Sequence, residues 1–284
     1  MEKENTLSEA IQSETKFASI KDYKIAYRSI GKGSPIILCN RFRGNLDDWD
    51  PAFLDALAKK YQVITFNSKG LASSTGTPHQ TILGFGKDAL DLADALNIDK
   101  FILGGWSLGG WAAQVLTTEF PNRITHTILI GTKPPGKVNY SMEEIFLKTA
   151  YIPDYTLEHE IILFFEPTSE ISKKAAVESH NRINKRENKD PKVRPELWEY
   201  YQKAHDDYIN DPYQSREKLM KVDTRPLLII SANHEVCFPP ENWFDLNQKL
   251  PTATLITIAQ TGHGPQSQYP EMIARYIDDF IETN

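Results

Sequence analysis

Residues 102–110 read ILGGWSLGG, and this stretch decides which fold the sequence predicts. It contains the pattern Gly-x-Ser-x-Gly around Ser107, in which a serine lies on a tight turn from a strand into a helix. Glycine is favoured on both sides because a Cβ atom there would strike neighbouring backbone. Residues 100–103 are apolar, as in a buried strand, and residues 110–120 have helical spacing before Pro121. The order of strand, turn and helix predicts a nucleophilic serine at Ser107.

The composition indicates a soluble globular protein. The 284 residues are 40% hydrophobic and 25% charged, and no stretch approaches the roughly 20 apolar residues of a membrane-spanning helix. The acidic, polar N-terminus lacks the features of a secretory signal, so we expect cytoplasmic residence. The net charge of −6 disfavours nucleic acid and anionic membranes as partners. Cys39 and Cys237 are too few for a disulfide framework and are expected to be reduced.

Strand and helix patterns alternate along most of the chain. Residues 16–30 hold two short apolar segments, as in a hairpin. Further strands are predicted at 35–39, 62–66, 100–103, 127–131, 226–231 and 254–258. Helices are predicted at 51–61, 81–96, 110–120, 241–250 and 270–281. This alternation predicts an α/β protein with a mostly parallel sheet covered by helices on both faces.

The strand pattern stops between residues 133 and 222, where the sequence becomes helical and rich in aromatic residues. Helices are predicted there at 142–151, 159–165, 169–185, 195–208 and 214–220. We interpret residues 133–222 as a helical cap inserted into a core that consists of residues 15–132 and 223–284. Residues 1–14 lack periodicity and are expected to form a flexible tail.

A serine hydroxyl is a poor nucleophile near neutral pH, so Ser107 needs a general base and a carboxylate that orients it. Among the seven histidines, His263 alone lies between the last predicted strand and the last helix, on a loop that also contains glycine. Glu235 is the only acid in residues 232–239, the loop after the preceding strand. The chain order Ser107, Glu235, His263 is the one expected for this architecture. No two histidines have metal-ligand spacing, so we expect neither metal nor cofactor.

Three motifs together resemble the α/β-hydrolase fold family, and the resemblance covers about residues 16–282. They are the pattern around Ser107, the Gly-His pair at 262 and 263, and the strand, loop and proline pattern at 226–240. The sequence is most similar to the capped, esterase-like branch. It resembles lactone-cleaving members that act on acyl-homoserine lactones in its Gly-Trp-Ser-Leu-Gly-Gly stretch and its glutamate, and uncharacterised bacterial and fungal members at residues 41–51.

The resemblance implies an oxyanion hole that consists of the backbone N–H groups of Phe42 and Leu108. Two departures from the family pattern stand out. Asn40 and Arg41 replace the usual His-Gly, although backbone donors survive a change of side chain. Asn67 and Ala72 replace a frequent aspartate and glycine. For Arg41 two roles stay open: pairing with Asp47 or Asp48, or guiding an anionic group of the substrate.

We therefore expect a serine hydrolase that cleaves a small, partly apolar carboxylic ester or lactone through an acyl-enzyme intermediate. The substrate pocket is expected to include Arg41, Trp106, Phe164 and Trp198. A C–C hydrolase or perhydrolase with the same triad is an alternative, as is a non-catalytic ligand-binding or receptor protein on this scaffold. Branches with an aspartate nucleophile are disfavoured by Ser107. The sequence leaves the oligomeric state open.

Overall fold

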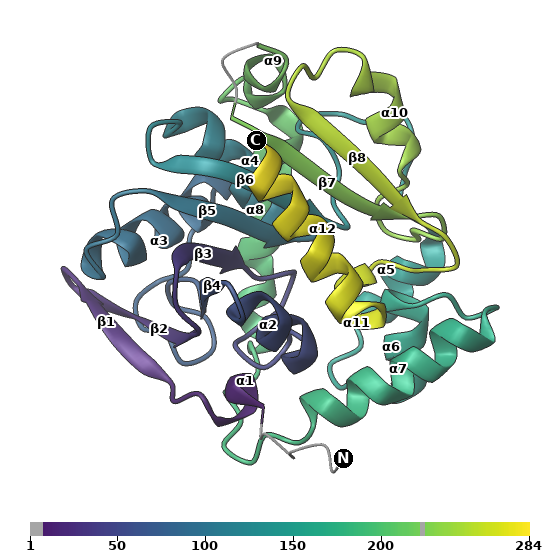
Figure 1. Ribbon diagram of the computed structural model, residues 1–284, viewed down its shortest axis with the longest axis horizontal. Helices are drawn as coiled ribbons and strands as arrows, with labels where there is room; N and C mark the ends of the chain where they lie inside the picture. The colour runs from purple at the N-terminus through teal and green to yellow at the C-terminus, as the bar shows by residue number, and fades with distance from the viewer. Residues whose placement is uncertain (1–7, 222–224) are drawn as a thin grey trace.

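The computed structural model describes residues 8–221 and 225–284 and contains an eight-stranded sheet in the order β1-β2-β4-β3-β5-β6-β7-β8 (Figure 1). The strands are β1 Lys16–Ile20, β2 Tyr23–Ile30, β3 Ser34–Cys39, β4 Tyr61–Phe66, β5 Phe101–Trp106, β6 Ile124–Ile130, β7 Leu227–Ala232 and β8 Ala253–Ile258. The pairs β1–β2 and β2–β4 are antiparallel, and the other neighbours are parallel. The predicted mostly parallel sheet is confirmed.

The central strands are buried on both faces, which explains their continuous apolar runs. In β3, Ile36 and Leu38 pack in one cluster with side chains from α1, α2 and α12, whereas Ile37 and Cys39 pack in the other, with α3, α4, α9 and α10. These helices are α1 Glu9–Gln12, α2 Pro51–Ala58, α3 Ile82–Ala95, α4 Leu108–Glu119, α9 Ser215–Leu219, α10 Glu241–Asn247 and α12 Pro270–Thr283. Figure 1 shows α2 and α12 in front of the sheet. Helices therefore cover both faces, as predicted.

Helices form most of the segment between residues 133 and 222, as the sequence predicts. They are α5 Glu144–Ala150, α6 Leu157–Phe164, α7 Glu170–Ile183, the short 3₁₀ helix η1 Pro195–Leu197 and α8 Trp198–Asn210. In Figure 1, α6 and α7 lie below α11 (Pro265–Gln268), away from the middle of the sheet, whereas α8 packs with residues of α3 and α4. Helix α9 differs, because Leu219 packs in the cluster on the α4 face of the sheet. The predicted boundary between residues 222 and 223 lies outside the described residues.

The segment expected to be a tail is ordered in its described part. Residues 8–14 include α1, and Ser8 accepts a hydrogen bond from the Ile11 N–H at its N-terminus. The Ala10 N–H donates to Asp55 at 2.8 Å, and Arg186 donates to the Ala10 carbonyl at 2.6 Å. The tail prediction is therefore wrong for residues 8–14, because these partners lie far away in the sequence and leave no local pattern. Residues 1–7 lie outside the described part of the chain.

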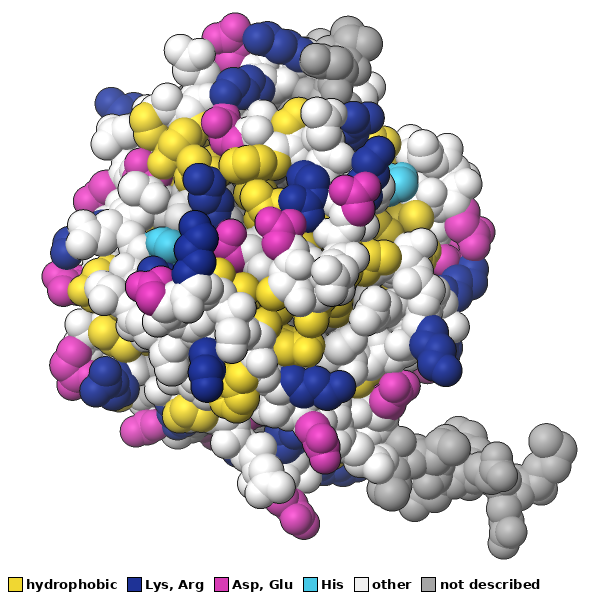
Figure 2. Space-filling view, turned by 90° about the vertical axis from the view of Figure 1, so that its left-hand side faces the viewer, with side chains coloured by type: hydrophobic (Ala, Val, Ile, Leu, Met, Phe, Trp, Pro, Cys, Tyr) yellow, Lys and Arg dark blue, Asp and Glu magenta, His cyan; other side chains and the backbone are white. Residues whose placement is uncertain are grey.

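Acidic and basic side chains are interspersed over the face drawn in Figure 2, and hydrophobic side chains gather near its middle. In the described ranges, none of the helices has both the length and the apolar character that crossing a membrane requires. Cys39 and Cys237 are both buried and do not form a disulfide.

Candidate active site

Ser107 is the single residue between β5 and α4, and its backbone is strained. Its φ of 58° and ψ of −121° lie where side-chain-bearing residues are rarely found. A Cβ atom at Gly105 would lie 2.2 Å from the Gly109 carbonyl oxygen, and one at Gly109 would lie 2.1 Å from the Cys39 carbonyl oxygen. Both positions therefore require glycine, and the serine is held at the carboxyl end of β5.

Glu235 and His263, which come from different loops, form a buried pair. His263 Nδ1 lies 2.8 Å from Glu235 Oε1 and 2.9 Å from Oε2. Their side chains are 1% and 0% exposed, so water does not compete for this contact. The Cys237 and Phe238 N–H groups donate to the same carboxylate at 3.0 and 3.2 Å. The carboxylate is thereby fixed by its own loop and can hold the imidazole in one orientation.

The His263 loop is tied to β5, the strand directly before Ser107. The Trp106 indole N–H donates to the His263 carbonyl at 2.8 Å, and the Gly264 N–H donates to the Phe164 carbonyl at 2.8 Å. Among the residues that the structure describes, no hydrogen bond joins the Ser107 hydroxyl to His263, whose side-chain bonds go to Glu235. In such sites this bond often tightens only when substrate is bound.

The two predicted oxyanion donors lie on touching segments. Leu108 is the first residue of α4, and Phe42 lies in the turn after β3 that the Gly44 N–H closes on the Arg41 carbonyl at 2.9 Å. The close approach of Gly109 to the end of β3 brings these segments together. Phe42 and Leu108 both line the same cavity as Ser107.

The cavity beside Ser107 has a volume of about 110 Å³ and a mostly apolar lining. Its wall comes from the core and from the helices between β6 and β7. The lining residues besides Ser107 are Phe42, Leu108, Trp111, Met142, Phe146, Leu147, Ala150, Tyr151, Tyr201, Gln202, His205, Cys237 and Phe238. A cavity of this size and lining suits a small apolar group attached to the atom that Ser107 would attack.

The pocket predicted from the sequence requires correction. Arg41, Trp106 and Phe164 line a separate, more polar cavity of about 260 Å³, and Trp198 lines neither cavity. The ring of Trp198 packs against Phe42 at a centroid distance of 5.9 Å. These residues lie near the site in the sequence pattern. The direction in which each side chain points, however, depends on tertiary packing.

Of the two roles considered for Arg41, the structure contains the first, which is pairing with Asp48. Its Nη2 atom bonds Asp48, and Nη1 donates to the Phe42 carbonyl at 2.8 Å. The guanidinium carbon lies 4.8 Å from the Phe164 ring centroid and 5.4 Å from the Trp106 ring. Arg41 thus joins the turn after β3 to aromatic side chains that separate it from His263.

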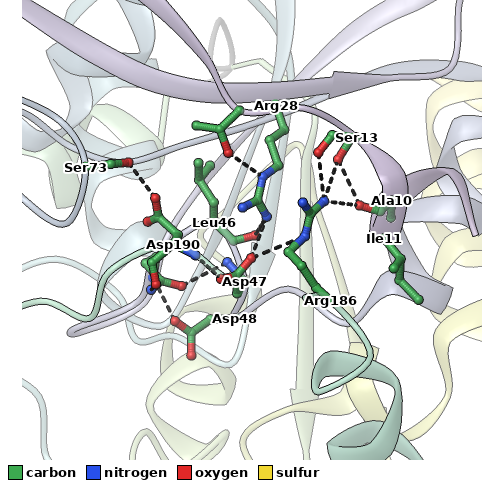
Figure 3. Close-up of polar contacts among 12 residues, drawn as sticks. Ala10, Ile11, Ser13, Arg28, Leu46, Asp47, Asp48, Ser73, Arg186 and Asp190 are labelled. Carbon is green, nitrogen blue, oxygen red and sulfur yellow. Dashed lines mark hydrogen bonds and ion pairs between the residues drawn. The ribbon is translucent and has the colours of Figure 1, made fainter. Parts of the chain in front are cut away.

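Asn67 occupies the position where the family often has aspartate. It binds the carboxylate of a residue that is distant in the sequence. Its Nδ2 donates to Asp190 Oδ2 at 2.8 Å, and the Ser73 hydroxyl donates to the other oxygen at 2.5 Å. Burial raises the pKa of the Asp190 carboxyl. Figure 3 shows Asp190 beside a polar cluster in which Asp47 lies between the guanidinium groups of Arg28 and Arg186. An aspartate at position 67 would repel Asp190.

Several cavity residues were not foreseen from the sequence. Trp111 lies four residues after Ser107 on α4, a spacing that places it on the same helix face and could have identified it. His205, which lies within the predicted helix 195–208, also lines the cavity. Cys237 and Phe238 follow Glu235 directly and belong to the same wall.

The comparisons with known proteins agree with this architecture. The model of the family described as alpha/beta hydrolase fold matches residues 34–270. An alpha/beta hydrolase fold protein from Chitinophaga pinensis is 25% identical, with a TM-score of 0.85 over 97% of this chain and 99% of that chain. The enol-lactonase from Burkholderia xenovorans shares the fold at 20% identity, with a TM-score of 0.73 over 94% of this chain and 100% of that one.

A curated relative is similar over a shorter stretch. The pimeloyl-[acyl-carrier protein] methyl ester esterase of Legionella pneumophila is 34% identical over 104 residues. This match covers 37% of the present chain and 40% of the esterase, so it spans less than half the length of that relative.

Proposed function

Because this chain belongs to the alpha/beta hydrolase fold family, we propose that it is a serine hydrolase that cleaves a small, partly apolar carboxylic ester or lactone. The observation that carries the proposal is the buried Glu235–His263 pair beside the strained turn of Ser107. The esterase and enol-lactonase named above add support, since both names describe ester bonds.

In the proposed reaction, His263 Nε2 takes the hydroxyl proton of Ser107 as the serine oxygen attacks the carbonyl carbon. The Phe42 and Leu108 N–H groups stabilise the negative charge that develops on the carbonyl oxygen. His263 then gives the proton to the departing alcohol oxygen, and the acyl group stays on Ser107. Water, deprotonated by His263, hydrolyses this ester and releases the acid.

Residues 133–222 are proposed to act as a cap that selects the substrate without supplying a member of the triad. Phe146, Leu147 and Tyr151 from this segment line the cavity, whereas Ser107 and His263 lie on the core. The roof would therefore set which acyl groups fit, and the core would carry the chemistry. Cytoplasmic residence remains a prediction from the sequence.

The test is labelling with a fluorophosphonate probe, which reacts with an activated serine. We expect the label on Ser107, and none on the Ser107→Ala variant. On a panel of esters, thioesters and lactones, the same substitution should reduce turnover on the order of 10⁶-fold, as in triad deletions of a serine protease.

The outcomes separate the candidate functions. Retention of more than a few per cent of activity in Ser107→Ala, with contamination excluded, would remove Ser107 from the mechanism. An unlabelled wild-type protein would favour the ligand-binding alternative. A labelled protein that cleaves no ester but hydrolyses a 1,5-diketone or forms peracid from hydrogen peroxide would favour the C–C hydrolase or the perhydrolase.

A further inference from the structure

The side chain of Lys133 is buried among aromatic rings. Lys133 follows the end of β6 and is 5% exposed. Its Nζ atom lies 5.3 Å from the ring of Trp111 and 6.0 Å from the rings of Tyr208 and of Phe238. Ring faces attract a cation but do not neutralise its charge. The lysine backbone is fixed as well, because the Tyr208 hydroxyl donates to its carbonyl at 2.8 Å.

This ammonium has no counter-charge within the described ranges 8–221 and 225–284. No carboxylate pairs with it there, and the charge of Arg216, which also acts on Lys133, has the same sign. Burial lowers the pKa of Lys133 to about 8, so the group is charged at neutral pH. Buried charges are normally paired, because an unpaired one loses its hydration without compensation.

The unpaired charge lies directly behind the wall of the cavity at Ser107. Trp111 and Phe238, whose rings face the ammonium, both line that cavity. His205 and Cys237, which also line it, are close enough for Lys133 to influence their pKa values. Charges interact strongly in such a region, because little water is present to screen them.

We propose that the missing counter-charge belongs to the substrate, and that the cavity takes an ester or lactone whose acyl part carries a carboxylate. This inference rests on the proposed function and specifies its substrate class. Lys133 attracts the carboxylate across the wall of Trp111 and Phe238, while the ester carbonyl lies at Ser107. The cavity of about 110 Å³ fits an acyl chain of only a few carbons between the two groups.

The experiment compares monomethyl glutarate with methyl 4-carbamoylbutanoate, a neutral ester of the same shape. We expect wild-type kcat/KM to favour the carboxylate by about tenfold or more, and Lys133→Met to abolish most of this preference. Lys133→Arg keeps the charge and should keep the preference. Lys69→Met is the matched control, because Lys69 also lies over a ring, that of Tyr23 at 4.3 Å, but outside the cavity. Lys69→Met should leave kcat/KM for both esters unchanged.

A second readout does not need turnover. Calorimetric titration of Ser107→Ala with each ester should show tighter binding of the carboxylate, and the double variant Ser107→Ala/Lys133→Met should lose the difference. Failure of all ester cleavage would refute the proposed function and still leave this binding test able to decide the inference. Equal affinities for the two esters would overturn the inference alone, as would a uniform loss on both esters in Lys133→Met.

The pH dependence gives a third readout if Lys133→Met fails to fold. The wild-type preference should decline as pH rises past about 8, where the amine loses its proton. The other groups that face Lys133 do not change charge there. Burial lowers the pKa of His205 and raises those of Tyr208 and Cys237, and Arg216 keeps its charge. A preference that stays constant to pH 10 would contradict the proposal.

Discussion

The carboxylate of Glu235 is fixed from two directions, by His263 and by the N–H groups of Cys237 and Phe238. We expect Glu235→Gln to keep the size of the side chain but to favour the wrong imidazole tautomer, because an amide can donate to Nδ1. Turnover should fall on the order of 10⁴-fold, if the geometry is as demanding as in serine proteases. Steady-state kinetics on a neutral ester measure this loss. A loss below about tenfold would mean that another acid orients His263, and that Glu235 serves only to shape its loop.

The buried ammonium of Lys133 should also reduce the stability of the protein. Folding lowers its pKa from 10.5 to about 8, so the unfolded chain binds more protons between these values and stability rises with pH there. We expect Lys133→Met to increase the free energy of unfolding at pH 7 by about 1–4 kcal/mol, because a buried charge is replaced by an apolar side chain of similar length. This gain should shrink as pH rises from about 8 towards 10.5. Urea unfolding of both proteins across this range is the measurement.

A Lys133→Met variant that is less stable than wild type at pH 7 would contradict this expectation. It would mean that the attraction to the three rings outweighs the loss of hydration. The missing counter-charge would then no longer need an explanation from the substrate.

At the scale of single residues, the sequence predicts the positions of Ser107, Glu235 and His263 because each follows a strand in a local pattern. It fails for the cavity wall. Arg41 and Trp198 were expected in the pocket, but their directions depend on aromatic partners distant in the sequence. Lys133 gives no local signal either, since lysine is among the residues most often exposed.

Among the elements, the loop after β7 and the turn between α6 and α7 are joined by a close contact between His234 and Glu166. His234 Nδ1 lies 2.6 Å from Glu166 Oε2, and His234 directly precedes Glu235. We expect His234→Gln to lower kcat about tenfold with little change in KM, because a small displacement of the acid loop misplaces His263. Steady-state kinetics separate the two constants.

A matched pair lies within the helices between β6 and β7. His180 Nδ1 lies 2.9 Å from Glu160 Oε2 and joins α7 to α6 without touching the loop of Glu235. His180→Gln should leave kcat within about a factor of two. Equal losses in the His234 and His180 variants would show that both pairs only stabilise the fold, and Tm measurements on each would confirm that reading.

Long apolar runs and helical spacing predict most elements because they reflect burial against the sheet. The prediction fails where an element is short or where part of it consists of glycine. Helices α1 and α11 contain four residues each, too few to show a period. Strand β5 continues to Trp106, beyond the predicted end at residue 103, because Gly104 and Gly105 carry no hydrophobic signal although they pair with β6.

For the whole molecule, the proposed division between a core that reacts and a cap that selects can be tested on one helix. Leu147 and Ile145 lie on α5 with exposures of 44% and 45%, but only Leu147 lines the cavity. We expect Leu147→Ala to reduce kcat/KM for longer acyl esters relative to acetate, by about fourfold for each methylene that loses its apolar contact. A series of acyl esters from acetate to hexanoate measures this.

Ile145→Ala is the control and should leave the chain-length profile unchanged. An equal loss for every ester in Leu147→Ala, with an unchanged fold, would mean that α5 supports the reacting residues directly. The division of roles between core and cap would then be wrong.

The carboxylate of Asp190, held by Asn67 and Ser73, has a consequence for how this chain can be recombined with its relatives. Residue 67 directly follows β4, whereas residue 190 belongs to the segment inserted between β6 and β7, so a chimera must take both residues from the same parent. A chimera that combines this insertion with a sheet bearing aspartate at position 67 would bury two facing carboxylates. A chimera that exchanges the insertion should therefore take residues 67 and 73 from the same parent protein as the insertion.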